Sequence, residues 1–110
     1  MAAVETVRGH VDTSALGRVL MHEHVFVLGA EFRQNYPDFP ARWDEQERID
    51  DAVEKLGELK SRGIDTIVDP TVIGLGRYIP RIQRVNELVD INIVAATGIY
   101  CYTDAPFQFQ

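Results

Sequence analysis

The stretch Ile64-Asp65-Thr66-Ile67-Val68-Asp69 decides the fold, because it is a short β-rich run between two segments with helical periodicity. Its β-branched residues favour an extended backbone, and Pro70 ends the run. The segment before it, residues 44–63, and the segment after it, from Pro80 onward, repeat apolar residues every three or four positions. Helix and strand are therefore predicted to alternate along this part of the chain.

Both helical segments carry signals for their ends as well as for their buried faces. Asp44-Glu45-Gln46-Glu47 matches a capping box, and Gly63 suits the C-terminal end of the first helix. Pro80 suits the first turn of the second helix. The predicted buried positions are Ile49, Val53, Leu56 and Leu59 in the first helix, and Ile82, Val85, Leu88 and Val89 in the second.

Further strands are predicted on either side of this helix, strand and helix unit. Residues 91–96 form a buried strand after the second helix, and residues 18–26 form one before the first. Residues 4–7 are predicted to be another strand, joined to 18–26 through the turn residues 12–17. This predicts an N-terminal hairpin, followed by an α/β fold with a parallel sheet and right-handed crossovers.

Composition limits the classes of protein to which the chain can belong. Its 110 residues are 45% apolar, with 11 basic and 17 acidic residues and a net charge of −6, so one domain over residues 1–110 is expected. Nucleic acid is not an expected partner, because phosphate binding requires a basic face. Apolar runs are too short to span a membrane, and the N-terminus lacks the regions of a signal peptide. A single cysteine fits a reducing compartment, so the chain is expected to be cytoplasmic.

Two histidines stand two residues apart in Leu20-Met21-His22-Glu23-His24-Val25-Phe26. Because side chains alternate across a strand, His22 and His24 project from one face and can share a metal ion. A single histidine is more often a structural residue, but the pair favours metal binding. Function in parallel sheets gathers at the carboxyl ends of the strands, which makes Asp69 a candidate as well, although it can equally cap a turn.

An ordered set of motifs along the whole chain resembles the phosphotriesterase family of the amidohydrolase superfamily. Within that family, the phosphotriesterase-like lactonases are the most similar group, and the resemblance covers the N-terminal third of such proteins. The motif His-x-His alone is weak, whereas the ordered set is specific. The motifs are Thr6-Val7-Arg8-Gly9, residues 17–24, residues 66–77, and Ala96-Thr97-Gly98-Ile99-Tyr100 with Pro106-Phe107.

The resemblance implies the first three strands of a TIM (β/α)8 barrel, preceded by the N-terminal β-hairpin. It implies two divalent metal ions, either zinc or a mixed iron and cobalt centre, bridged by a hydroxide and a carbamylated lysine. The implied activity is that of a binuclear-metal hydrolase which opens lactones. Its substrates would include the N-acyl-homoserine lactones of bacterial signalling, an activity called quorum quenching, and organophosphate triesters would be hydrolysed more slowly.

The same resemblance implies the roles of individual residues. His22 and His24 match metal ligands, and Tyr100 and Val27 match residues of the substrate pocket, although a tyrosine such as Tyr100 can also simply pack at a strand end. The bridging lysine, two further histidines and the aspartate of the family follow the third strand, so no catalytic residue is expected within this chain.

Two kinds of assembly follow from the resemblance. The chain is expected to form a homodimer or to pair with a complementing C-terminal segment that carries the missing strands. The alternative is a catalytically inactive truncated chain that acts, if at all, as an oligomerising or complementing fragment.

Overall fold

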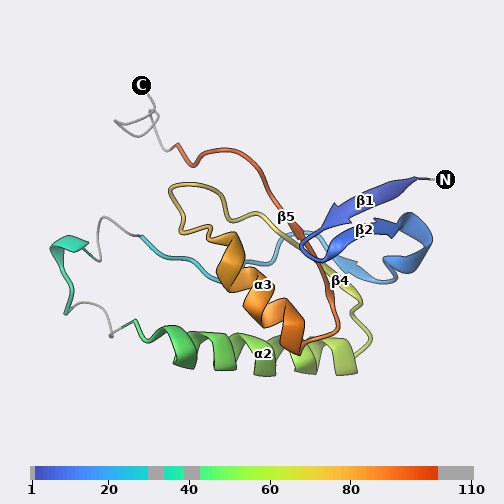
Figure 1. Ribbon diagram of the computed structural model, residues 1–110, viewed down its shortest axis with the longest axis horizontal. Coiled ribbons are helices and arrows are strands. Elements are labelled where there is room, and N and C mark those ends of the chain that lie inside the picture. Colours follow the sequence, from blue (N-terminus) through green and yellow to red (C-terminus); the bar gives the residue numbers. More distant parts are fainter. Residues whose placement is uncertain (1, 30–33, 39–42, 102–110) are drawn as a thin grey trace.

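The structure is a computed structural model that describes residues 2–29, 34–38 and 43–101. Figure 1 shows two helices packed along one side of a small sheet, with a hairpin near the N-terminus. Within the described ranges, no helix is both long and apolar enough to cross a membrane. The elements are β1 (Ala3–Thr6), β2 (Gly9–Asp12), the 3-10 helix η1 (Thr13–Ala15), β3 (Val19–Leu20), α2 (Glu45–Ser61), β4 (Thr66–Asp69), α3 (Ile79–Leu88) and β5 (Asn92–Ala95).

Strands β3, β4 and β5 form a parallel sheet in sequence order. Leu20 pairs with Ile67 on the central strand, and Ile67 pairs with Ile93 on the other side. Helix α2 precedes β4 and helix α3 precedes β5, and the two helices pack against each other (Figure 1). This arrangement confirms the predicted α/β class with a parallel sheet.

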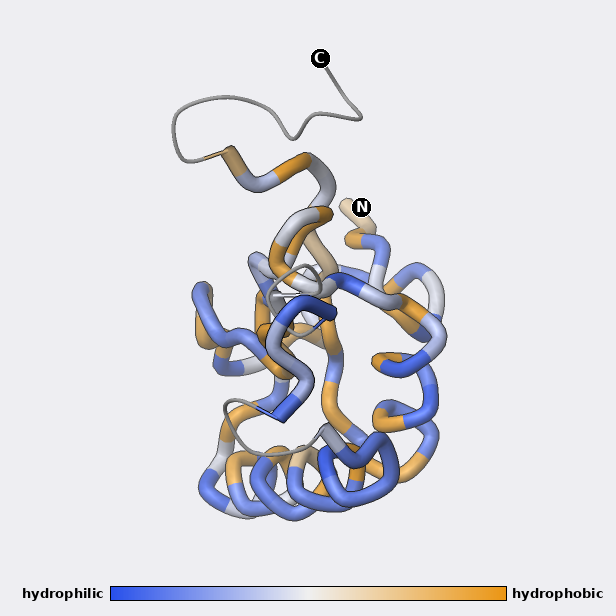
Figure 2. Tube along the Cα trace, turned by 90° about the vertical axis from the view of Figure 1, so that its left-hand side faces the viewer, coloured by the Kyte–Doolittle hydropathy of each residue, from blue (hydrophilic) through white to orange (hydrophobic). Residues whose placement is uncertain are grey.

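The hydrophobic core lies between the sheet and the two helices. Hydrophobic and hydrophilic residues alternate around α2, as Figure 2 shows, and its hydrophobic residues contribute to this core. Ile82 and Val85 of α3 and Val89, the residue just after it, are buried as predicted, but Leu88 is 65% exposed. The prediction for Leu88 is wrong, because Ile82 and Val85 lie on the face that packs on the core and Leu88 falls on the flank of the helix.

Helix α2 begins and ends where the sequence predicts. The side chain of Asp44 accepts a hydrogen bond from the backbone N–H of Glu47 at 2.9 Å, which satisfies a free donor of the first turn. Beyond the helix, Gly63 adopts a φ of +94°, which glycine reaches without strain. Helix α3 has Pro80 in its first turn, also as predicted.

The N-terminal hairpin has different partners from those predicted. β1 pairs with β2, not with residues 18–26, and its turn lies at Val7-Arg8. Gly9 has a φ of +112°, and the hydroxyl of Thr6 donates to the carbonyl of Gly9 at 2.7 Å. A two-residue turn of this kind favours pairing of the nearest strands. Residues 12–17 therefore do not connect a hairpin, and instead contain η1 and lead into β3.

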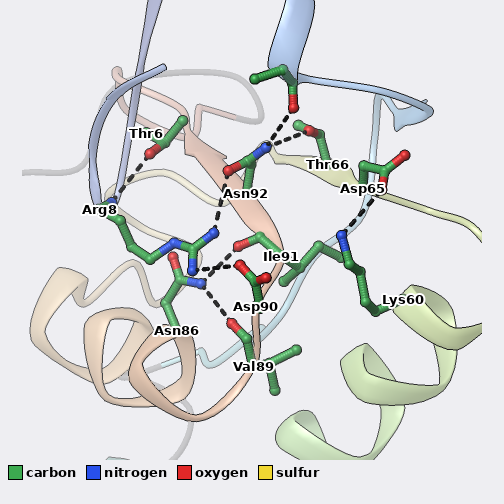
Figure 3. Close-up of polar contacts among 11 residues, drawn as sticks. Thr6, Arg8, Lys60, Asp65, Thr66, Asn86, Val89, Asp90, Ile91 and Asn92 are labelled. Carbon is green, nitrogen blue, oxygen red and sulfur yellow. Dashed lines mark hydrogen bonds and ion pairs between the residues drawn. The ribbon is translucent and has the colours of Figure 1, made fainter. Parts of the chain in front are cut away.

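Polar contacts fasten the hairpin to the amino end of the parallel sheet (Figure 3). Arg8, in the hairpin turn, donates to Asp90 at 3.0 Å and to Asn92 at 3.3 Å. Asn92 in turn donates to the hydroxyl of Thr66 at 3.2 Å, and these two residues begin β5 and β4. The hairpin thus lies at the amino end of the sheet, so it does not cover the carboxyl ends of the strands.

Substitution of Gly76 by alanine is expected to lower the free energy of unfolding by about 2 kcal/mol. Gly76 has a φ of +98°, and a Cβ there would lie 2.8 Å from the backbone nitrogen and oxygen of Leu28. Gly57→Ala is the matched control, because Gly57 lies in α2 with nothing within 4 Å of a Cβ, and it should stabilise the chain by up to about 1 kcal/mol. Urea unfolding followed by circular dichroism measures both, and equal stability of the two variants would contradict the close approach of Leu28.

Candidate functional site

His22 and His24 lie side by side just beyond the carboxyl end of β3. Their ring centroids are 5.2 Å apart, and the ring planes make an angle of 82°. The predicted strand over residues 18–26 is present but much shorter than predicted, because the pairing of β3 with β4 ends at Leu20. The backbone N–H of Glu23 still donates to the carbonyl of Val68 at 3.0 Å. The histidine pair is therefore carried by a loop segment that remains next to β4.

Asp69 and Thr71 support this loop segment from the end of β4. Asp69 is only 3% exposed, and its carboxylate accepts hydrogen bonds from the N–H groups of Thr71 at 2.9 Å and Val25 at 3.3 Å. The hydroxyl oxygen of Thr71 lies 2.8 Å from Nδ1 of His24. Asp69 therefore caps the turn and also holds the loop segment in place, whereas its role in function stays a prediction. Sequence reasoning missed Thr71, whose only signal is its place in the Asp-Pro-Thr turn.

The histidine pair brings two imidazole donors together, which is fewer than a metal site needs. Over residues 2–29, 34–38 and 43–101, no group of three or more His, Cys, Asp or Glu side chains is placed to hold a metal ion. Neutral imidazole suits zinc and related divalent metals, and a catalytic zinc takes three protein ligands. Two imidazoles therefore fit a metal ion only if further ligands are added from outside these residues, and the role of His22 and His24 as ligands stays a prediction.

A groove of about 540 Å³ opens beside the histidine pair, between α2 and the segment 23–27. His24, Val27 and Trp43 line one side, and Leu56 and Leu59 of α2 line the other. Val27 is 56% exposed. The structure thus places one of the two predicted pocket residues in a cavity next to a predicted metal ligand.

Tyr100 lies on the loop after β5 and is exposed. Its N–H donates to the carbonyl of Ile73 at 2.7 Å, and a single bridge pairs Ile73 with Ile99. The loops after β4 and β5 therefore run side by side at the carboxyl end of the sheet. Of the described residues, those lining the groove beside His24 do not include Tyr100, so its role in the pocket stays a prediction.

A nearly buried arginine anchors the histidine loop to the two helices. The Arg81 side chain is 10% exposed, and its guanidinium carbon lies 5.5, 5.1 and 5.1 Å from the ring centroids of Phe26, Trp43 and Tyr78. Its Nε donates to Glu45 at 2.7 Å, and this hydrogen bond is the main reason that the pKa of Glu45 lies below its ordinary value. Because Phe26 belongs to the segment that carries the histidine pair, the cluster restrains that segment.

Comparison with known proteins finds relatives over the whole chain. The model of the phosphotriesterase family matches residues 2–110. A phosphotriesterase homology protein of Mycobacterium tuberculosis is 58% identical over 110 residues, which are 100% of this chain and 33% of that protein. An aryldialkylphosphatase of Saccharolobus solfataricus is 40% identical over 99 residues, which are 90% of this chain and 31% of that protein.

The solved structures agree with this result. The structure of the phosphotriesterase from Mycobacterium tuberculosis matches with a TM-score of 0.88 and 56% sequence identity, over 98% of this chain and 33% of that one. The present chain thus spans about one third of the length of these relatives. Its hairpin and three parallel strands correspond to the first part of a TIM barrel, as predicted.

Proposed function

The chain belongs to the phosphotriesterase family, and on that premise we propose that it is the N-terminal portion of a metal-dependent hydrolase that opens lactones. One observation carries the proposal. His22 and His24, with ring centroids 5.2 Å apart, lie at the carboxyl end of the sheet, where catalytic groups of parallel barrels gather. Residues 1–110 would then form part of a single barrel domain rather than a complete one.

N-acyl-homoserine lactones are the proposed substrates, and organophosphate triesters are proposed as slower ones. The segments Gly74-Leu75-Gly76-Arg77 and Gly98-Ile99-Tyr100 support lactones, because they resemble the lactonase group of the family. The name of the Saccharolobus solfataricus relative, an aryldialkylphosphatase, supports phosphate esters. Hydrolysis of such lactones would interrupt bacterial signalling.

The chain contributes ligands and substrate contacts to this proposed activity. His22 and His24 would hold a divalent metal, with zinc proposed first and iron or cobalt as alternatives. A pair of bound divalent metals supplies an activated water and polarises the ester carbonyl. The N–H of Glu23 and the Arg81 cluster hold the loop with the two imidazoles in place, and Val27 and Tyr100 are proposed to contact the lactone.

The remaining metal ligands are proposed to come from a segment that carries the rest of the barrel. Such a segment would also pair with β3, which lies at the edge of the sheet order. An unpaired strand edge invites pairing with further strands. A homodimer of the completed barrel is proposed as the assembly.

Complementation tests this proposal directly. The chain is mixed with a segment carrying the remaining two thirds of the Mycobacterium tuberculosis relative, and hydrolysis of an N-acyl-homoserine lactone and of an aryl dialkyl phosphate is measured with and without zinc. We expect zinc-dependent lactone hydrolysis in the mixture only, with a slower rate on the phosphate. His22→Ala should abolish it, whereas His10→Ala, in β2, should leave it intact.

An absence of any rate above background in the mixture would reject the proposal. The alternative is then a non-catalytic chain that oligomerises. Sedimentation velocity would detect such an oligomer as a species larger than the 12.4 kDa of one chain.

A further inference from the structure

The hydroxyl of Thr71 lies among three polar atoms, two of which can only accept a hydrogen bond. Its oxygen is 2.5 Å from Oδ1 of Asp69 and 3.3 Å from the carbonyl oxygen of Phe26. The third neighbour, at 2.8 Å, is Nδ1 of His24, which donates or accepts according to its tautomer. Thr71 is 4% exposed, so these contacts are largely shielded from water.

A threonine hydroxyl has one proton, and this decides the direction of each hydrogen bond. A proton directed at His24 would turn the lone pairs of the hydroxyl toward both acceptors, Asp69 and Phe26, in a buried place where unpaired acceptors are destabilising. A proton directed at Asp69 forms a short hydrogen bond to a carboxylate and leaves only the longer contact to Phe26 without a proton. His24 must then donate from Nδ1.

We infer that Asp69 and Thr71 are positioning residues that hold His24 in its Nδ1–H tautomer, so that Nε2 carries the free lone pair. Histidines that bind metals commonly donate their other ring N–H to a carboxylate or carbonyl, which fixes the ring and raises its basicity. Here Nδ1 of His24 is 3.9 Å from Asp69, too far for a direct hydrogen bond, and the Thr71 hydroxyl bridges the gap. The role toward a metal rests on the proposed function, whereas the tautomer does not.

Ring-nitrogen NMR of the full 110-residue chain tests the tautomer without metal. In the uniformly ¹⁵N-labelled chain, at a pH where histidine is neutral, long-range proton–nitrogen correlations report which ring nitrogen carries the proton. We expect the proton of His24 on Nδ1, whereas His10, exposed in β2, serves as the internal reference for a solvated ring. A wild-type spectrum with the proton on Nε2 of His24 overturns the inference without the need for any variant.

Two substitutions of Thr71 identify the group responsible. Thr71→Val removes the hydroxyl at nearly constant volume, and the His24 proton should then move toward Nε2, the position that a free histidine side chain prefers. Thr71→Ser keeps the hydroxyl and should preserve the wild-type tautomer, which separates the hydrogen bond from mere packing. The same tautomer in Thr71→Val and in the wild type would overturn the inference.

Zinc titration distinguishes failure of the inference from failure of the proposed function. The titration uses each labelled chain mixed with the segment that carries the rest of the barrel, because that segment is proposed to supply the other ligands. The Nε2 resonance of His24 reports zinc binding, which should be about 10- to 100-fold weaker for Thr71→Val than for the wild type and near the wild type for Thr71→Ser. A wild-type mixture that shows the Nδ1–H tautomer and binds no zinc would sustain the positioning role and count against the metal-dependent function. Equal zinc affinity in Thr71→Val and wild type would overturn the role of the Thr71 hydroxyl in metal binding.

Discussion

Replacement of Ile93 by alanine is expected to lower the free energy of unfolding by about 4 kcal/mol. Ile93 is 0% exposed and pairs with Ile67 on the central strand. It belongs to the hydrophobic core cluster that also contains Val85 of α3. The alanine would leave a cavity that these rigid neighbours cannot fill, and the loss is a large fraction of the total stability of a small domain.

Two control variants show whether the loss comes from the core. Ile93→Val removes one methylene and should lower stability by about 1 kcal/mol. Leu88→Ala removes a side chain that is 65% exposed and should change stability by less than about 0.5 kcal/mol. Urea unfolding monitored by circular dichroism gives all three values, and a similar loss for Leu88→Ala and Ile93→Ala would contradict the position of the core.

The parts of the fold that depend on local signals could be predicted from the sequence. The capping residue Asp44, the glycine at 63 and the proline at 80 act within a few residues of themselves, and the structure confirms the helix ends that they mark. The parallel sheet followed from the alternation of strands and helices. These features need no knowledge of distant contacts.

Features that depend on competition between pairings were predicted less well. The apolar run over residues 18–26 suggested a long strand, but only Val19 and Leu20 pair with β4 before the chain turns into the histidine loop. Strand β1 pairs with β2, which follows it after two residues, and not with the more distant residues 18–26. Hydropathy alone does not report where a ladder of hydrogen bonds ends.

The candidate site shows the same division between local and distant signals. The spacing of His22 and His24 pointed to the pair, and the structure brings the two rings together. The contact between His24 and Thr71 joins residues 47 positions apart, and that between Arg81 and Glu45 joins residues 36 positions apart. No periodicity links such positions, so the groups that support the histidines became evident only in three dimensions.

Arg81→Ala is expected to lower the free energy of unfolding by about 3 kcal/mol. The substitution removes contacts with three aromatic rings and the 2.7 Å hydrogen bond to Glu45, all made by a side chain that is only 10% exposed. Arg81→Lys is the matched control. Lysine keeps the charge but not the planar group that stacks on the rings, so its loss should be intermediate.

The pH dependence of the Arg81→Ala effect has a defined sign. Arg81 is the main cause that holds the pKa of Glu45 below 4.5 in the folded chain. A carboxyl group with a lowered folded-state pKa adds stability above its unfolded pKa, and this stability is lost as the pH falls through the folded pKa. The difference in unfolding free energy between wild type and Arg81→Ala should therefore be full at neutral pH and should become smaller in acid, as the pH falls through the lowered folded-state pKa of Glu45. A difference that stays constant between these two conditions, or one that Glu45→Gln leaves pH-dependent, would show that Glu45 is not the group through which Arg81 acts.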